Sequence, residues 1–266
     1  MTGAAIKGLI PSLVVVLTIP ASGAASAQAE VNAEIAPAGR LRVGMNASNT
    51  TLVTRATDGR VSGISVDLGR FIATRLGASF EPIVYSSPAT YTESFGTGEW
   101  DIIVTGNNAA TAKMVDFSAD VILIDFVFVA APGRAFGQAG QVDRPGVKIG
   151  VARNGSADVF LTGALKSASL VRASGDVATG IDLLRSGNAD AYATITDSAL
   201  AIVDSVSGAT IVPGVVTTVG FGIATPKGRS SAARSMLAKL IGEAKAAGVV
   251  QRAIDTSGLK GVRVAP

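Results

Sequence analysis

Short runs of apolar and β-branched residues alternate with longer segments of helical period along most of this chain. Leu41–Met45 predicts a first strand, and Ile64–Leu76 predicts an amphipathic helix that ends at Gly77. The elements that follow are a strand at Phe80–Tyr85, a short helix at Tyr91–Gly98 and a strand at Asp101–Thr105. The sequence therefore predicts a βαβαβ unit with a mainly parallel sheet.

The same alternation recurs in the second half of the chain. Its elements are a strand at Lys148–Ala152, a helix at Ala157–Leu165, a strand at Ser169–Arg172, a helix at Asp176–Ser186 and a strand at Ala189–Thr194. We therefore predict an α/β fold with two similar lobes.

Two extended segments, Val127–Ala131 and Gly220–Thr225, connect the predicted lobes, and two crossings of this kind predict a hinged cleft. The last two predicted helices are amphipathic and should return to cover the first lobe. Their inward positions include Leu237, Leu240, Ile241 and Ala244. The predicted first lobe comprises residues 40–131 and 222–266, and the second comprises residues 132–221.

Residues 1–27 have the pattern of a secretory signal peptide. Lys7 precedes an apolar run, Leu9–Ile19, and small residues close the segment at Ala25–Ala27. The run is shorter than the roughly 20 residues of a membrane-spanning helix. Cysteine is absent, which excludes a lipid-modified cysteine after cleavage. We expect cleavage near Ala27 and a mature chain that is free in the periplasm.

The composition excludes several classes of function. With no His and no Cys, the Ser-His and Cys-His nucleophile systems and thiolate metal sites are impossible. No calcium-binding loop and no phosphate-binding glycine loop is present, so we expect neither a metal nor a cofactor. The formal net charge of +3 is too small to indicate nucleic-acid binding.

Four loops should face the cleft, because ligands of open parallel sheets bind beyond the carboxyl ends of the strands. These loops are Asn46–Asn49, Thr105–Thr111, Arg153–Ser156 and Thr194–Asp197.

Several motifs, in order along the chain, resemble those of the family 3 extracellular solute-binding proteins. They include Arg40–Asn46 (RLRVGMN), Asp58–Leu68, Gly98–Gly106 (GEWDIIVTG), Val115–Ser118 (VDFS), Lys148–Val151 and Gly220–Gly228 (GFGIATPKG). The resemblance implies a periplasmic-binding-protein-like type II fold, with two α/β lobes, a two-segment hinge and a central cleft. It also implies a monomer that delivers a small-molecule solute to the permease of an ABC transporter in the inner membrane.

The resemblance fails at the residue that matters most for an amino-acid ligand. Receptors of this kind usually hold the ligand carboxylate with an Arg about seven residues before the position of Ser118, and Thr111 stands there. A Thr hydroxyl has neither the charge nor the two-pronged geometry of a guanidinium. The aromatic residue and prolines that typically follow the first strand are also replaced, by Asn49–Leu52. The identity of the solute therefore stays open.

Ten residues remain as candidates for ligand binding. They are Asn46, Asn49, Asn107, Asn108, Thr111, Arg153, Asn154, Gly155, Ser156 and Asp197. Arg153 and the helix start at Ser156 are the candidates for an acidic group, and Asp197 resembles the family's partner of the ligand ammonium. Each has a structural alternative: turn formation for the two Asn after Gly106, a surface ion pair for Arg153, and helix capping for Ser156 and Asp197.

The resulting expectation is a non-enzymatic receptor for a small polar solute, such as an amino acid or a related amine or organic acid. The alternative is a periplasmic enzyme resembling cyclohexadienyl dehydratase, which shares this architecture. That chemistry needs an acid in the cleft, and Asp125 and Asp197 are the candidates.

Overall fold

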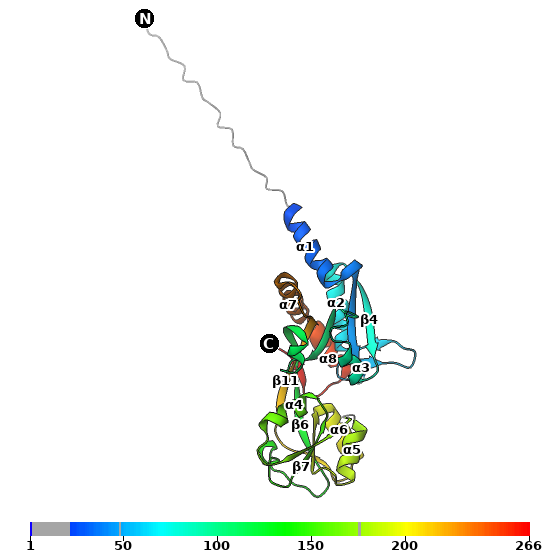
Figure 1. The fold of residues 1–266 in the computed structure, drawn as a ribbon, viewed down its shortest axis with the longest axis vertical. Coiled ribbons are helices and arrows are strands. Elements are labelled where there is room, and N and C mark those ends of the chain that lie inside the picture. The colour runs from blue at the N-terminus through cyan, green and yellow to red at the C-terminus, as the bar shows by residue number, and fades with distance from the viewer. Residues whose placement is uncertain (2–21, 48, 175–176) are drawn as a thin grey trace.

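The computed structural model describes Met1 and residues 22–47, 49–174 and 177–266. Figure 1 shows two α/β halves, one above the other, joined by the strands β6 (Val115–Ala130) and β11 (Thr217–Pro226). The main sheet has the strand order β4-β1-β5-β11-β6-β9-β7-β8, so β11 and β6 lie at its centre. Each half contributes three parallel strands on one side of this antiparallel pair.

The first half contains the predicted βαβαβ unit. Its elements are β1 (Arg40–Asn46), α2 (Ile64–Leu76), β4 (Ser79–Tyr85), α3 (Pro88–Glu93) and β5 (Ile102–Gly106), with a small hairpin of β2 (Thr54–Arg55) and β3 (Val61–Ser62). The predicted bounds of α2 are confirmed, and the helix ends because Gly77 adopts the left-handed conformation, with φ 68°.

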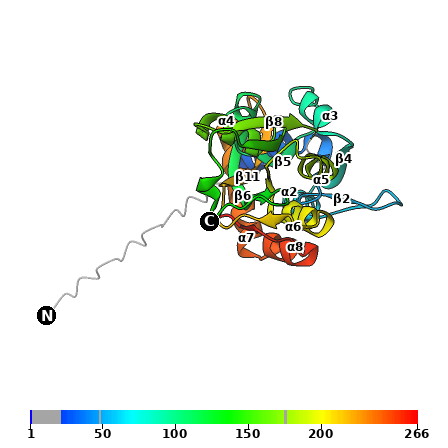
Figure 2. The same cartoon turned by 90° about the horizontal axis from the view of Figure 1, so that it is seen from below.

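The second half repeats this arrangement. Its elements are β7 (Lys148–Ala152), α4 (Ser156–Ala164), β8 (Ser169–Ala173), α5 (Val177–Arg185), β9 (Ala191–Ile195) and α6 (Thr196–Ser205). The bounds of β7 match the prediction. The helix predicted at Asp176–Ser186 corresponds to α5, and its predicted start, Asp176, lies outside the described residues. Figure 1 shows α5 and α6 together in the lower half, and in Figure 2 the same two helices lie side by side as seen from below.

The central strands run through both halves. Over its 16 residues β6 pairs with β11, with β9 and with the short strands β10 (Thr210–Ile211) and β12 (Val262–Val264). The predicted crossings at Val127–Ala131 and Gly220–Thr225 therefore belong to two longer strands, which form one continuous ladder. A register shift between Phe221 and Gly222 marks a β-bulge in that ladder.

The last two helices, α7 (Ser231–Ala246) and α8 (Val249–Ser257), pack on α2 as predicted. The four predicted inward positions of α7, Leu237, Leu240, Ile241 and Ala244, are all buried. The helix begins at Ser230, whose Oγ accepts a hydrogen bond from the Ala233 N–H. Because both helices pack on α2, they cover the first half and not the second.

The sequence-based interpretation was wrong about the helix expected at Tyr91–Gly98. The helix α3 begins three residues earlier, because Ser87 Oγ accepts the Thr90 N–H and Pro88 occupies the first turn. It stops at Glu93, and Gly96 with φ 90° then turns the chain toward β5.

The N-terminal segment includes a helix that the sequence did not predict, α1 (Ser22–Ile35), which packs on α7. Ile35 is buried, and Glu34 accepts hydrogen bonds from the N–H and the Oγ of Ser230. Most of the predicted signal peptide, residues 2–21, lies outside the described residues. Among the helices that the structure describes, none has the length and apolar character needed to cross a bilayer.

Candidate functional site

A pocket of about 240 Å³ lies where the two halves meet beside β11. It is lined by Asn107, Asn108, Ser156, Val159, Phe160, Thr217, Thr218, Val219 and Gly220. The asparagines follow β5 in the first half, the next three residues belong to α4 in the second half, and the last four belong to β11. The pocket is therefore built from both halves and from a strand that joins them.

The pocket exists because β5 ends earlier than β11. The two strands pair only over Phe221–Ala224, and the Asn107 N–H then donates to the Gly220 carbonyl over 2.8 Å. Beyond that bond β11 continues alongside β6, so Thr217–Val219 have no partner in β5. The first turns of α4 lie over this part of β11.

Asn107 is oriented by a carboxylate. Its Nδ2 donates to Asp120 Oδ1 over 3.1 Å. Because an ionised carboxylate can only accept, this bond assigns the amide orientation and turns Asn107 Oδ1 away from Asp120. Asp120 itself packs against Gly220, where an added Cβ would collide with the carboxylate.

Asn108 forms the turn that the sequence analysis considered as an alternative. Its Oδ1 accepts the N–H groups of Ala110 and Thr111, each over 3.0 Å, and its Nδ2 donates to the Gly106 carbonyl. These bonds fix the loop and leave the second Nδ2 hydrogen as the free polar group of this side chain. Asn108 thus shapes the pocket wall as well as lining it.

The halves approach each other closely at Gly106 and Ser156. A Cβ at position 106 would lie 3.1 Å from Ser156 Oγ and 3.7 Å from Asn108 Nδ2. Gly106 therefore permits this contact, since any side chain would press on α4. Ser156 is the first residue of α4, and the N-cap is Gly155.

A buried carboxylate occupies the first turn of α4. Asp158 is 4 % exposed and accepts the Asn154 N–H, the Thr162 hydroxyl and the Nε of Arg172. Asn154 adopts the left-handed conformation, with φ 59°, which brings its N–H to this carboxylate. The charge of Asp158 already complements the positive end of the helix.

Arg153 lies outside the lining of the pocket. Its side chain is exposed and its Nη2 donates to the Arg172 carbonyl over 3.4 Å. This contact is to the backbone of β8.

The remaining predicted residues are distributed around the pocket. Asn46 ends β1 beside Tyr85, and Asn49 forms a turn whose carbonyl accepts the Leu52 N–H. Thr111 begins a short 3-10 turn after the asparagine loop. Asp197 lies in the first turn of α6, where its Oδ1 accepts the Lys260 N–H over 2.8 Å. The structure thus brings Asn107, Asn108 and Ser156 together in one pocket and places the other seven outside its lining.

Asp125 lies on β6 and is held by two donors. Thr218 Oγ1 and Arg263 Nη1 each donate to its carboxylate over 2.7 Å. Burial alone would raise the pKa of Asp125, but the bonds from Arg263 and Thr218 outweigh it and lower the pKa below its ordinary value. Asp125 is therefore an anion at neutral pH.

Sequence reasoning missed Val159, Phe160 and the β11 residues of the pocket. One signal was present, since Ala157 and Leu161 are the buried positions of α4, which leaves Val159 and Phe160 as an outward apolar pair. No comparable signal marks Thr217–Gly220, because their role depends on where β5 ends.

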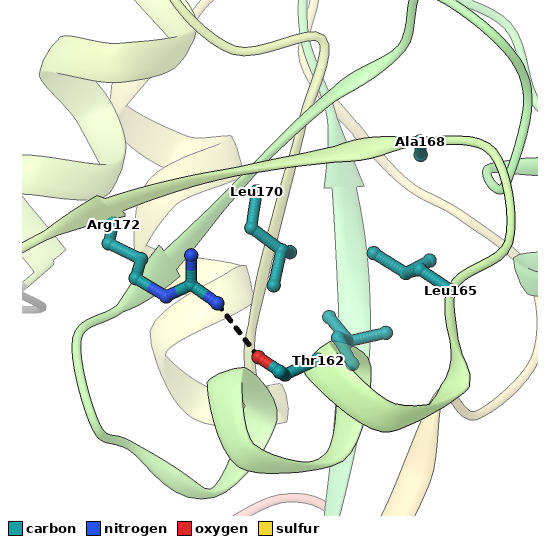
Figure 3. Close-up of a pocket in the computed structure, with 6 residues that line it drawn as sticks. Thr162, Leu165, Ala168, Leu170 and Arg172 are labelled. Carbon is teal, nitrogen blue, oxygen red and sulfur yellow. Dashed lines mark hydrogen bonds between the residues drawn. The ribbon is translucent and has the colours of Figure 1, made fainter.

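A second hollow of about 230 Å³ lies between α4 and β8. It is lined by Leu161, Thr162, Leu165, Ala168, Leu170 and Arg172. Figure 3 shows the Arg172 guanidinium turned toward Thr162, to which it donates a hydrogen bond of 2.8 Å, with Leu170 beside it and Leu165 farther along the hollow. Because Arg172 also forms an ion pair with Asp158, its guanidinium binds two side chains of α4 and stabilises the packing of that helix on β8.

The strand order, the two parallel halves and the antiparallel connection define the fold of the type II periplasmic binding proteins. The model of the bacterial extracellular solute-binding proteins, family 3, matches residues 41–256, and the chain belongs to that family. No curated protein matches the chain.

Solved structures with the same fold are amino-acid-binding proteins of low sequence identity. A mutant of ArgBP from T. maritima has a TM-score of 0.67 at 22% identity, covering 86% of this chain and 99% of its own. An ancestral arginine-binding protein bound to arginine has a TM-score of 0.67 at 23% identity, covering 82% and 97%. The ancestral amino acid-binding protein AncCDT-1, a precursor of cyclohexadienyl dehydratase, has a TM-score of 0.67 at 21% identity, covering 82% and 94%.

Proposed function

We propose that this chain is the periplasmic solute-binding component of an ABC importer and that it closes around one small polar solute. The observation that carries the proposal is the pocket whose walls come from both halves, with the asparagine loop on one side and α4 on the other. A solute that contacts both walls stabilises the arrangement in which they are close, so binding favours closure about β6 and β11. The permease would recognise the closed form.

The other parts of the proposal follow from the resemblance to the family. The lobes divide into residues 40–131 with 222–266, and residues 132–221, and of the ten sequence-based candidates we assign Asn107, Asn108 and Ser156 to the ligand. The leader is removed near Ala27 and the mature monomer remains in the periplasm. N-terminal sequencing of protein recovered from a periplasmic extract tests the cleavage position.

The main experiment is a ligand screen followed by a measurement of closure. A solute at about a hundredfold over its dissociation constant should add roughly 2.7 kcal/mol to stability, which a thermal-shift assay detects. The panel contains amino acids, amines, organic acids and neutral polar compounds. Small-angle scattering with each hit should then show a smaller radius of gyration. Binding without compaction would contradict the closure mechanism.

A glycine pair provides the matched control. Gly106→Val places a side chain where Ser156 Oγ is 3.1 Å from a Cβ, so it should keep the halves apart and abolish ligand-induced compaction. Gly140→Val is the control, because a Cβ at Gly140 meets nothing within 4 Å and Gly140 is outside the pocket. Equal compaction in both variants would overturn the assignment of this contact to closure.

The alternative is an enzyme resembling cyclohexadienyl dehydratase, and the likeness to AncCDT-1 keeps it open. The contacts of the two candidate acids speak against it, since bonds from Arg263 and Thr218 lower the pKa of Asp125, and Asp197 lies outside the pocket lining, bonded to the Lys260 N–H. A general acid must carry a proton to give. Incubation with excess prephenate or arogenate separates the two functions, because a receptor returns the compound unchanged and a dehydratase consumes many equivalents.

A further inference from the structure

The walls of the pocket between the halves carry no ionisable side chain. The lining consists of two asparagines, a serine, two threonines, a glycine, two valines and a phenylalanine. An ionised ligand group loses hydration on entering a pocket and needs a partner of opposite charge to compensate. Among the residues that the structure describes around this pocket, no lining side chain offers such a partner.

Two carboxylates, Asp120 and Asp125, are bonded to side chains of the pocket lining but are not part of it. Asp125 is bonded to Thr218 and Arg263, and Asp120 is bonded to the amide of Asn107. The charge of Asp120 also favours the protonated form of Lys245, although burial lowers the pKa of that amine overall. Asp125 is thus paired with a cation, and neither carboxylate is among the residues that line the pocket.

Two oxygen atoms of the pocket lining, one on Asn107 and one on Ser156, can accept hydrogen bonds from a ligand. The bond from Asn107 Nδ2 to Asp120 turns Asn107 Oδ1 away from the carboxylate, and no donor among the described residues bonds to that oxygen. Ser156 Oγ likewise has no hydrogen-bond partner among the described residues. A ligand with an N–H or O–H donor would satisfy both oxygens.

Beyond Ser156, the α4 wall is apolar and incompletely covered. Val159 is 37% exposed and Phe160 is 41% exposed, and both project from α4 into the pocket lining beside Val219. Large apolar side chains that line a concave surface with a few polar groups are typical of small-molecule sites. At the packing density of a protein interior, the pocket accommodates about ten non-hydrogen atoms.

We propose that this site takes an uncharged amphipathic solute, with an amide or hydroxyl donor at Asn107 and Ser156 and an apolar body of a few carbons against Val159 and Phe160. The inference rests on the proposed function and narrows it. It departs from the ionised ligands, amino acids, amines and organic acids, that the family resemblance implies.

Two sets of nearly isosteric probes test the charge preference by titration calorimetry on the mature protein. The sets are isovaleramide, isovalerate and isoamylamine, and phenylacetamide, phenylacetate and phenethylamine. The amide of each set should bind at least about tenfold tighter than the acid and the amine, because only the amide enters without losing ionic hydration. An acid or an amine that binds as tightly as its amide would overturn the inference.

A pair of variants tests the apolar wall. Phe160→Ala should weaken binding of phenylacetamide by about tenfold, since the ring covers the ligand's apolar body. Leu200→Ala is the control, because Leu200 is also 41% exposed but lies on α6, outside the pocket lining. Equal affinities in the two variants would overturn the placement of the apolar body.

The outcomes separate this inference from the proposed function. If arginine, lysine or an organic acid binds and compacts the protein while the amides do not, the receptor function stands and the inference fails. If no compound in either panel binds, both fail together. Amide binding with compaction supports both.

Discussion

Each half of the sheet has an aspartate at the equivalent position, and the two aspartates lie in different environments. In the first half, Asp101 precedes β5, its N–H donates to the Arg42 carbonyl, and its carboxylate accepts the Arg42 N–H. In the second half, Asp190 precedes β9 and makes the same two bonds with Lys148. We call each of these an aspartate bridge, because it links the first and third strands of its half.

The bridges differ in burial and in the cations around them. The Asp101 side chain is fully buried and forms ion pairs with Arg42 and Arg229. The Asp190 side chain is 11% exposed and pairs with Arg134, which is 57% exposed. A fully buried charge depends on its ion-pair partners for its stability, whereas an ion pair whose cation lies in water is partly replaced by hydration when it is broken. One repeated motif therefore contributes unequally to the stability of the two halves.

The largest effect should come from Asp101→Ala. Removing this carboxylate leaves Arg42 and Arg229 facing a cavity, and breaking a buried ion pair costs about 3–5 kcal/mol. Urea denaturation, followed by circular dichroism, measures the loss in the free energy of unfolding. A loss below about 1 kcal/mol would show that hydration compensates both bridges alike.

A glycine occupies the equivalent position in each half, two residues after the bridged cation. Gly44 lies against Trp100 and Ile103, and in the second half Gly150 lies against Tyr192, with an added Cβ only 2.6 Å from its ring. Gly150→Ala should therefore cost about 3 kcal/mol, near the upper part of the range for overpacking. The measurement is again the urea midpoint.

Gly242→Ala is the matched control for that substitution. Gly242 is exposed inside α7, and a Cβ there meets nothing within 4 Å. This variant should gain up to about 1 kcal/mol because Ala favours the helix. Similar changes in the two variants would mean that backbone preference, and not the aromatic ring, decides the effect at Gly150.

Asp190→Ala should have a smaller effect than Asp101→Ala or Gly150→Ala. The Lys148 N–H loses its acceptor, which costs about 2 kcal/mol for a part-buried donor, while Arg134 returns to water. Measured beside Asp101→Ala under the same conditions, it tests the comparison directly. A loss equal to that of Asp101→Ala would contradict the role assigned to burial.

Local signals explain which elements the sequence could predict. The helix Ile64–Leu76 has the predicted bounds because its period, its burial and Gly77 at its end agree. The strand Lys148–Ala152 also has the predicted bounds, because its short apolar run is buried as one segment. The helix at α3 was misplaced although its start was readable, since Ser87–Pro88 is a capping pair and the apolar period drew the prediction toward Tyr91. The hairpin β2–β3 and the strand β12 carry too few residues for a period to appear.

The residues of the pocket also fall into a group that the sequence could predict and a group that it could not. Asn107, Asn108 and Ser156 were predicted because loops at the carboxyl ends of parallel strands meet in the cleft. Thr217–Gly220 were not, because their exposure to the pocket follows from β5 ending at Gly106 while β11 continues, a property of two strands more than a hundred residues apart. Sequence spacing carries no record of such a difference in strand length.

The smallest effect belongs to the ion pair between Arg263 of β12 and Asp125 of β6, two neighbouring strands. Arg263 is half exposed, so Arg263→Ala should cost roughly 1 kcal/mol or less at pH 7. The bonds that hold Asp125 lower its pKa despite burial, so their contribution is present above its unfolded pKa of about 3.9 and is lost as the pH falls through the folded value. The difference between the two proteins should therefore shrink below about pH 4.

Thermal unfolding of wild type and Arg263→Ala at pH 7 and at pH 3 measures that difference. Arg60→Ala is the control, because Arg60 pairs with Asp58 on the surface and is 84% exposed. A difference that does not shrink at all between pH 7 and pH 3 would show that Arg263 acts by packing against β6 and not through the charge of Asp125. A loss as large as that of Asp190→Ala would show that this exposed ion pair stabilises the protein as much as the Asp190 bridge does.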